Sequence, residues 1–438
     1  MARKLTRILD KLVQVGPSYL DQTLRSYATE NKEYRLYEDK PNDPSANTFA
    51  VFSFFSSGIY KTEEPRVVDI LLVGGGGGGS IGNLAGGSGG GGVVEIKDAL
   101  IPAGTYKITI GAGGAGGITS ASLLASGINN VINPDDGINQ AQGSSGSDTS
   151  FETLAGDEKI TALGGGPGGF RKQDTFPVGG GSGGGAGGAD DGDTTSMIGQ
   201  ISDIDTSVTT AITNGYLRPS AGDTMFTNYA DQIGGYDDTT LLADMNITKH
   251  FGNSGGNSDA YGTSGTATYS AGGGGGAGVA GEKGNDFRGG NGGDGISLEW
   301  VNEVFQKVYK FNGDIFWGAG GGGAAAADKE PGAGGKGGGG GGAAYRVTGN
   351  TPGEIFNNGK RGELGYNEGY DGYRLKGGAG GQNTGSGAGG SCTIGSAVYS
   401  PWGTILDISA FLTALEKGNN GGSGFALIRV HMSDNPAV

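Results

Sequence analysis

The sequence contains very little cysteine and histidine. Its 438 residues include one cysteine, Cys392, and two histidines, His250 and His431. A single cysteine excludes a disulfide framework and a zinc site built from several thiolates. Both histidines are expected at the surface or at strand ends, so a nucleophile activated by a neighbouring imidazole has no favoured base. The sequence therefore predicts no enzymatic activity, no metal site and no cofactor.

Long apolar runs and an excess of positive charge are also missing. No stretch approaches the ~18–20 apolar residues of a membrane span. Residues 1–14 lack the uninterrupted apolar core of a secretion signal. Acidic residues outnumber basic residues by 45 to 30, which gives a net charge of −15 and opposes contact with nucleic-acid phosphates. We expect neither membrane insertion, nor nucleic-acid binding, nor signal-dependent secretion.

Glycine, in contrast, is abundant, with 99 residues, many of them in runs. The first run, residues 74–79, directly follows the apolar stretch 67–73. Glycine lacks a Cβ, so two glycine backbones can approach very closely. A polyproline-II-type helix has three residues per turn and no internal hydrogen bonds, so its backbone groups need partners in neighbouring segments. The runs predict a mainly β and irregular fold, a sandwich of polyglycine II helices flanked by short β-strands.

The composition divides the chain into three parts. Residues 1–65 have apolar residues at helical spacing near their start and a strand-like stretch at 47–55. They predict a small α-containing anchoring module, with a simple terminal cap as the alternative. Residues 66–430 form the predicted glycine-rich domain, and 431–438 a tail. Long insertions interrupt the domain at about 190–251, 296–317, 343–376 and 392–415, and the aromatic residues of 298–317 predict a packed hydrophobic patch.

The order of several motifs resembles the glycine-rich domain of phage tail-fibre and receptor-binding adhesin proteins. An apolar strand enters polyglycine at residues 70–79, and P-x-G-T-Y-x-I-x-I-G-A-G-G begins at Pro102. A closing G-G-S-G strand spans 421–430. The resemblance covers about residues 67–430, and residues 1–65 lie outside it.

The resemblance implies a virion protein, released by host lysis, that attaches the particle to the host cell surface. Its implied partners are other virion proteins, bound through residues 1–65, and a host surface glycan or outer-membrane protein. Fibre proteins are commonly trimeric, so a homotrimer is one implied assembly. A purely structural virion component, such as a fibre shaft, baseplate, tail or head decoration, is the alternative. A non-viral glycine-helix protein is a third interpretation.

Aromatic and basic side chains in two insertions are the candidate receptor contacts. They are Tyr366, Tyr370, Tyr373, Arg374 and Trp402. Tyrosine and arginine are enriched among the residues that dominate binding energy. The alternative is that these tyrosines pack over glycine helices, which offer no side chains of their own. The loops expected to contact the host span about residues 190–251, 343–376 and 392–412.

Three further patterns predict no site. The G-x-G-x-x-G match that begins at Gly111 follows a strand, as a dinucleotide fingerprint does, but glycine is so frequent here that chance explains it. Paired carboxylates for glycoside hydrolysis are numerous, and nothing selects one pair. An acidic cluster lacks the spacing of a twelve-residue calcium loop, so a solvated loop is favoured over calcium binding. Its members are Asp190, Asp191, Asp193, Asp203 and Asp205.

Overall fold

Most of the described chain is β-structure or extended glycine-rich backbone. The computed structural model describes residues 34–38, 47–82, 84–117, 142–154, 159–169, 180–187, 248–258, 270–285, 287–311, 313–325, 329–343, 363–364, 374–391 and 419–432. Within these ranges all strand pairs are antiparallel and there is one α-helix. The predicted mainly β fold class is confirmed. No helix among the described residues is long and apolar enough to cross a membrane.

The larger sheet has six strands and pairs early strands of the described chain with its last strand. Its order is β1 (Tyr34–Glu38), β2 (Thr48–Phe54), β12 (Phe425–His431), β4 (Arg66–Val73), β5 (Val93–Ile101) and β9 (Thr248–Phe251). β4 and β12 are nearly continuous apolar runs because both faces of this sheet are covered. Along β4 and β12, even-numbered residues such as Ile70 and Leu72 pack on one face, and odd-numbered residues such as Leu71 pack on the other.

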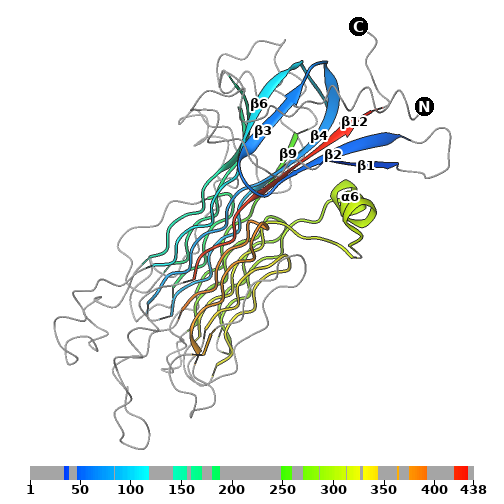
Figure 1. Cartoon of the computed structure of the whole chain (residues 1–438). Helices are drawn as coiled ribbons and strands as arrows, with labels where there is room; N and C mark the ends of the chain where they lie inside the picture. The colour runs from blue at the N-terminus through cyan, green and yellow to red at the C-terminus, as the bar shows by residue number, and fades with distance from the viewer. Residues whose placement is uncertain are drawn as a thin grey trace, which may run out of the picture.

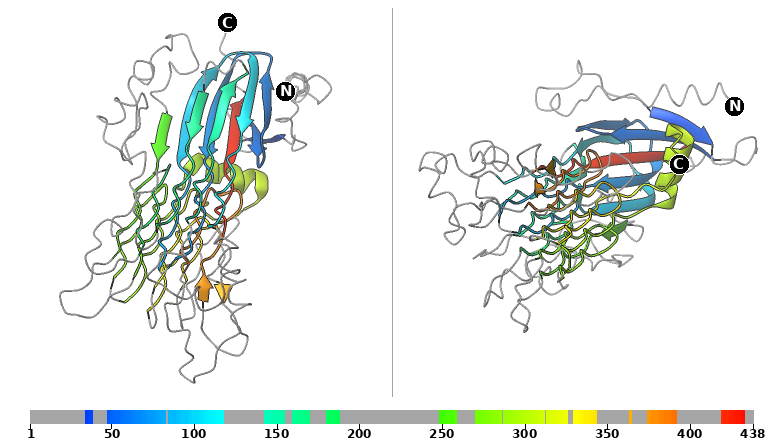
Figure 2. Two further views of the ribbon diagram at one scale, coloured as in Figure 1. Left: turned by 90° about the vertical axis from the view of Figure 1, so that its left-hand side faces the viewer. Right: turned by 90° about the horizontal axis from the view of Figure 1, so that it is seen from below.

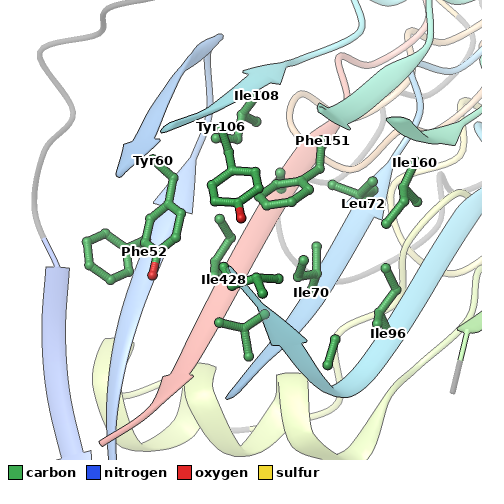
Figure 3. Packing of buried hydrophobic residues seen from close by; sticks show 14 of the residues in the cluster. Phe52, Tyr60, Ile70, Leu72, Ile96, Tyr106, Ile108, Phe151, Ile160 and Ile428 are labelled. Carbon is green, nitrogen blue, oxygen red and sulfur yellow. The ribbon is translucent and has the colours of Figure 1, made fainter. Parts of the chain in front are cut away.

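A smaller sheet covers the first of these faces. Its order is β3 (Gly58–Thr62), β6 (Gly104–Thr109), β7 (Thr149–Thr153) and β8 (Lys159–Ala162). Along β6 only Tyr106 and Ile108 are buried, so this sheet has one face toward the core and one toward water. The Tyr106 and Phe151 rings stack with centroids 4.8 Å apart over the apolar side chains of the larger sheet (Figure 3).

The helix α6 (Glu299–Tyr309) covers the other face of the six-stranded sheet. Its buried side chains, Val301, Val304, Phe305 and Val308 among them, recur at the spacing of one helix face. Lys310 ends the helix in the left-handed conformation, with φ 59°. The predicted hydrophobic patch is thus confirmed, but the helix that carries it was not predicted.

The glycine-rich segments run side by side away from the two sheets (Figure 1). In residues 74–79, hydrogen bonds reach a different neighbour at each successive residue. Gly74 and Gly77 donate to segment 86–92, Gly75 and Gly78 to 142–148, and Gly76 and Gly79 to 419–424, with N···O distances of 2.8–2.9 Å. Carbonyl groups of the same segment accept from Gly114, Gly165 and Ala388, which belong to three further segments.

The close approach of these segments explains why they contain glycine. A Cβ at Gly76 would lie 2.1 Å from the carbonyl oxygen of Ser386, and one at Gly75 would lie 2.1 Å from that of Ala112. Real Cβ atoms essentially never come this close to an oxygen, so any side chain here would push two backbones apart. We call this bundle of hydrogen-bonded glycine-rich segments the slab.

The strands cross several of the predicted domain boundaries. β2 and β3 lie within the predicted 1–65 module but belong to the two main sheets, and β2 pairs directly with β12. Residues 248–251, assigned to the 190–251 insertion, form β9, and β12 continues to His431, assigned to the tail. Composition could not show which sheet each of these strands joins, because each strand pairs with a strand that is distant in sequence. Residues 1–33, which carry the predicted helical stripe, lie outside the described residues.

Candidate functional site

The slab has one end at the sheets and one end away from them. β4 leads directly into segment 74–79, and segment 86–92 leads directly into β5. Gly74 donates to Gly92 and Gly77 donates to Gly89, both at 2.9 Å, so the two segments are antiparallel. The connection 80–85 therefore lies at the end away from the sheets. We call this end the tip.

Three long connections begin and end at the tip. Segment 111–117 leaves β6 and segment 142–148 enters β7, so residues 117 and 142 lie there. Segment 419–424 enters β12, and Gly422 donates to Ser386 at 2.8 Å, which places residues 391 and 419 at the same end. Ala343 donates to the Gly390 carbonyl at 3.0 Å, and Gly378 donates to that of Gly341 at 2.7 Å, so residues 343 and 377 lie at the tip as well.

Hydrogen bonds fix the bases of these connections against one another. Gly117 donates to the Gly79 carbonyl at 2.9 Å, and Gly79 donates to the Asn419 carbonyl at 2.8 Å. The Asn419 side-chain amide donates to the Gly377 carbonyl, and Gly377 N–H donates to Ser391 Oγ at 3.3 Å. The flanks of connections 118–141, 344–376 and 392–418 thus form one bonded group.

Ser80 lies at the centre of this group. Its Oγ donates to the Gly168 carbonyl at 2.5 Å and accepts from Gly143 N–H at 3.1 Å. Its carbonyl accepts from Ser391 N–H at 3.3 Å. Ser80 and Ser391 are both buried, so these contacts are part of the interior of the slab. We call the set Gly79, Ser80, Gly117, Gly143, Gly377, Ser391 and Asn419 the tip cluster.

The predicted receptor contacts belong to two of these three connections. Tyr366, Tyr370, Tyr373 and Trp402 lie outside the described residues. Arg374 begins β11 (Arg374–Lys376), which pairs with β10 (Glu363–Leu364) at the end of the slab away from the sheets (Figure 2, left, orange). The pair encloses residues 365–373, so the two ends of the tyrosine-bearing stretch are held together at the tip.

The other predicted insertions are placed differently. Segment 180–187 runs parallel to 163–169, away from the sheets, whereas β9 lies in the six-stranded sheet. The 190–251 insertion therefore has one flank at the tip and the other at the sheets. The 296–317 insertion lies at the sheet end, because Ile296 and Trp317 pair there and α6 packs on the sheet.

One aromatic residue at the tip was missed by the sequence analysis. Phe287 is 81% exposed and lies in the turn between segments 281–285 and 289–295, next to the tip connection that contains Glu330. Asn285 Oδ1 accepts from Phe287 N–H at 2.9 Å, and the Phe287 carbonyl accepts from Glu330 N–H at 3.2 Å. The turn backbone is therefore fixed while the ring faces water. In the sequence, Phe287 could have been noticed as a lone aromatic residue within a glycine-rich stretch.

Comparison with known proteins gives one result that bears on this architecture. Residues 56–298, more than half of the chain, match a family model described as a glycine-rich domain. The match begins just before β3 and extends to the residue before α6. No curated protein matches the chain.

Proposed function

The chain belongs to the glycine-rich domain family, and on that premise we propose that it is a phage virion adhesin. In this proposal it is a tail-fibre or receptor-binding protein whose tip contacts a glycan or an outer-membrane protein of the host. Residues 1–65 attach it to other virion proteins from the sheet end. The protein acts by binding and has no enzymatic role.

The observation that supports this proposal is the shared origin of three long connections. Their bases are bonded into the tip cluster, at the opposite end from β1 and α6. Binding residues are concentrated on loops that a rigid scaffold positions. Loops with fixed bases lose less conformational entropy on binding than free segments do, which raises affinity. The residues Tyr366, Tyr370, Tyr373, Arg374 and Trp402 are the proposed receptor contacts.

We further propose that the glycine-rich segments are polyglycine II helices packed as a sandwich. The three-residue repeat of hydrogen bonding in segment 74–79 supports this, because such a helix turns once every three residues. The exposure pattern of segment 111–117 supports it as well. Ala112 and Ala115 are three residues apart and exposed. Gly114, which lies between them, and Gly116, which follows Ala115, are buried.

A loop exchange on the intact chain tests the adhesin proposal. One variant replaces residues 393–417 with a glycine-serine linker of equal length, and a second does the same for 365–373, the stretch between β10 and β11. The matched control replaces two exposed apolar residues that lie away from the tip, Val279→Ser and Leu154→Ser. Binding of the labelled, purified protein to host cells is measured by flow cytometry, and folding is checked by circular dichroism.

We expect both loop variants to fold and to lose cell binding, and the control to keep it. Gold-labelled antibody on purified virions is expected to mark distal fibre tips. Full cell binding by both loop variants would remove these loops from the receptor contacts. No cell binding by the unchanged chain, or gold confined to a collar, baseplate or capsid, would instead support the purely structural component. Virions without label would reject a virion protein altogether.

A further inference from the structure

Two carboxylates and one imidazole converge on the six-stranded sheet, far from the tip cluster. They are Asp69 on β4, Asp98 at an irregularity in β5, and His431 at the end of β12. One donor atom from each lies within 4.8 Å of the other two. Asp69 and His431 are buried, whereas the Asp98 side chain is 65% exposed. The group is therefore closed on the protein side and open to water at Asp98.

The spacing of these atoms is that of ligands around a single small cation. His431 Nε2 lies 2.8 Å from Asp69 Oδ2 and 3.7 Å from Asp98 Oδ1. Zinc binds imidazole nitrogen and carboxylate oxygen at ~2.0–2.2 Å, so tetrahedral ligands lie roughly 3.4 Å apart. The two observed separations fall on either side of that value. Small side-chain movements would bring all three atoms into one coordination sphere.

The buried carboxylate already has the outer contacts that a metal ligand requires. Asp69 Oδ1 accepts from Asp98 N–H at 2.8 Å, and Asp69 Oδ2 accepts from Arg429 Nε at 2.6 Å. The Arg429 guanidinium contacts Phe49 and Trp300, at 4.6 and 4.9 Å from their ring centroids. Such outer hydrogen bonds orient a ligating carboxylate and are a regular part of metal sites.

The local charge favours a cation. The positive charge of Arg429 is shared between two carboxylates, because its Nε bonds Asp69 at 2.6 Å and its Nη1 lies 3.6 Å from Glu303 of α6. Lys307 Nζ also lies 3.1 Å from Glu303 Oε1. Asp98 adds a third carboxylate beside His431, so carboxylates outnumber basic side chains by three to two in this group. Attraction between opposite charges is strong where water is excluded, as it is around Asp69.

We propose that Asp69, Asp98 and His431 form a divalent transition-metal site, with zinc as the best-fitting ion. The ion replaces the hydrogen bond between His431 and Asp69 and binds Nε2. The proton that Nε2 donated to Asp69 moves through solvent to Nδ1, so the ligand is a neutral imidazole. Water occupies the open position beside Asp98. The site joins β4, β5 and β12, so metal binding stabilises the pairing of β12 with β4 in the sheet.

The test uses the full chain, freed of metal with a chelator and titrated with Zn²⁺. We expect one saturating equivalent to raise the melting temperature. Co²⁺ added in its place is expected to give the visible absorption of a four-coordinate site. The informative variant is Asp98→Asn, because Asp98 is exposed and has φ 54°, a conformation that asparagine tolerates well. It should fold normally and bind Zn²⁺ at least tenfold more weakly.

A matched control and a second variant make the result specific. Glu282→Gln removes a half-exposed carboxylate elsewhere on the surface, and it should bind as the unchanged chain does. His431→Gln keeps a donor for Asp69 but removes the imidazole, and it should lose the Co²⁺ absorption. Absence of saturable binding overturns the proposal. Binding that Asp98→Asn leaves unchanged overturns it too, because the ion would then belong to other carboxylates.

Discussion

The indole ring of Trp317 stacks on the phenyl ring of Phe425, with centroids 4.8 Å apart and ring planes 6° from parallel. Trp317 pairs with Ile296, and α6 lies in the stretch of chain between these two residues. Phe425 is the first residue of β12. Both residues are fully buried. This contact therefore joins the helix, the six-stranded sheet and the start of the slab at one point.

Replacing Trp317 with alanine is expected to destabilise the chain severely. Truncating a buried aromatic side chain to alanine costs about 3–5 kcal/mol, because contacts are lost and a cavity remains. The measurement is urea unfolding of the full chain, followed by near-ultraviolet circular dichroism. Phe287→Ala is the control, because that ring is 81% exposed, and its midpoint should not change. Equal midpoints for the two variants would contradict the packing described for Trp317.

A methyl group added to a slab glycine is expected to prevent folding. Gly76→Ala places a Cβ 2.1 Å from the Ser386 carbonyl oxygen, so one of two hydrogen-bonded backbones has to shift. Gly104→Ala is the matched control, since the nearest atoms to its Cβ belong to the Tyr106 ring at 3.7 Å. We expect a soluble, cooperatively melting control and an aggregated or non-cooperative Gly76→Ala protein. A normal melting curve for Gly76→Ala would disprove the close packing of the slab.

The partly buried imidazole of His250 is expected to make stability depend on pH. Its Nε2 is buried on β9 opposite Val94, and burial lowers the pKa of His250 from 6.5 to about 4. Between these values the unfolded chain takes up a proton that the folded chain does not, so stability falls as pH falls. The loss is about 3 kcal/mol between pH 6.5 and pH 4 at ~1.4 kcal/mol per pH unit.

His250→Phe should remove that part of the acid sensitivity. Phenylalanine is uncharged at every pH and similar in size, so the variant should lose less stability than the unchanged chain between pH 7 and pH 4. Denaturant midpoints at pH 7, 5.5 and 4 measure the difference. Parallel losses in the two proteins would show that other groups cause the pH dependence.

Replacing Tyr366, Tyr370 and Tyr373 together with alanine should weaken adsorption to host cells. Residues that dominate a binding site each contribute more than about 1 kcal/mol, so a triple change should reduce affinity by about tenfold or more. The melting temperature should stay the same, because β10 and β11 still close the base of this stretch. Unchanged adsorption would remove these tyrosines from the receptor contacts.

Local sequence patterns predicted some strands and the reason for the glycine runs, but not how the strands pair. The apolar stretches at 67–73 and 425–430 are β4 and β12, and the stretch at 106–110 overlaps β6. The neighbours of β12, in contrast, are β2 and β4, from the opposite end of the chain. No short-range pattern encodes such a pairing. The sequence signal of helix α6 lies in Val301, Val304, Phe305 and Val308, which recur at helical spacing, and the aromatic residues alone do not show that period.

Of the candidate site, the loops were predictable from the sequence, but their common position at the tip was not. The insertions at 343–376 and 392–415 were recognised because they interrupt the glycine pattern. Whether both flanks of an insertion reach the same end depends on how many times the chain has crossed the slab. That number is set by hydrogen bonds such as those of Gly79 with Gly117 and Asn419. The sequence therefore indicated loops, and the structure showed which of them share the tip.

The central position of β12 has a consequence for synthesis of the protein on the ribosome. β2 and β4 have no strand between them until residues 425–431 emerge, although both emerge among the first 73 residues. At ~5–20 residues per second this interval lasts on the order of tens of seconds. During that time two apolar strand edges are exposed. We therefore expect cellular production of the full-length protein to depend on a chaperone that shields those edges until translation is complete.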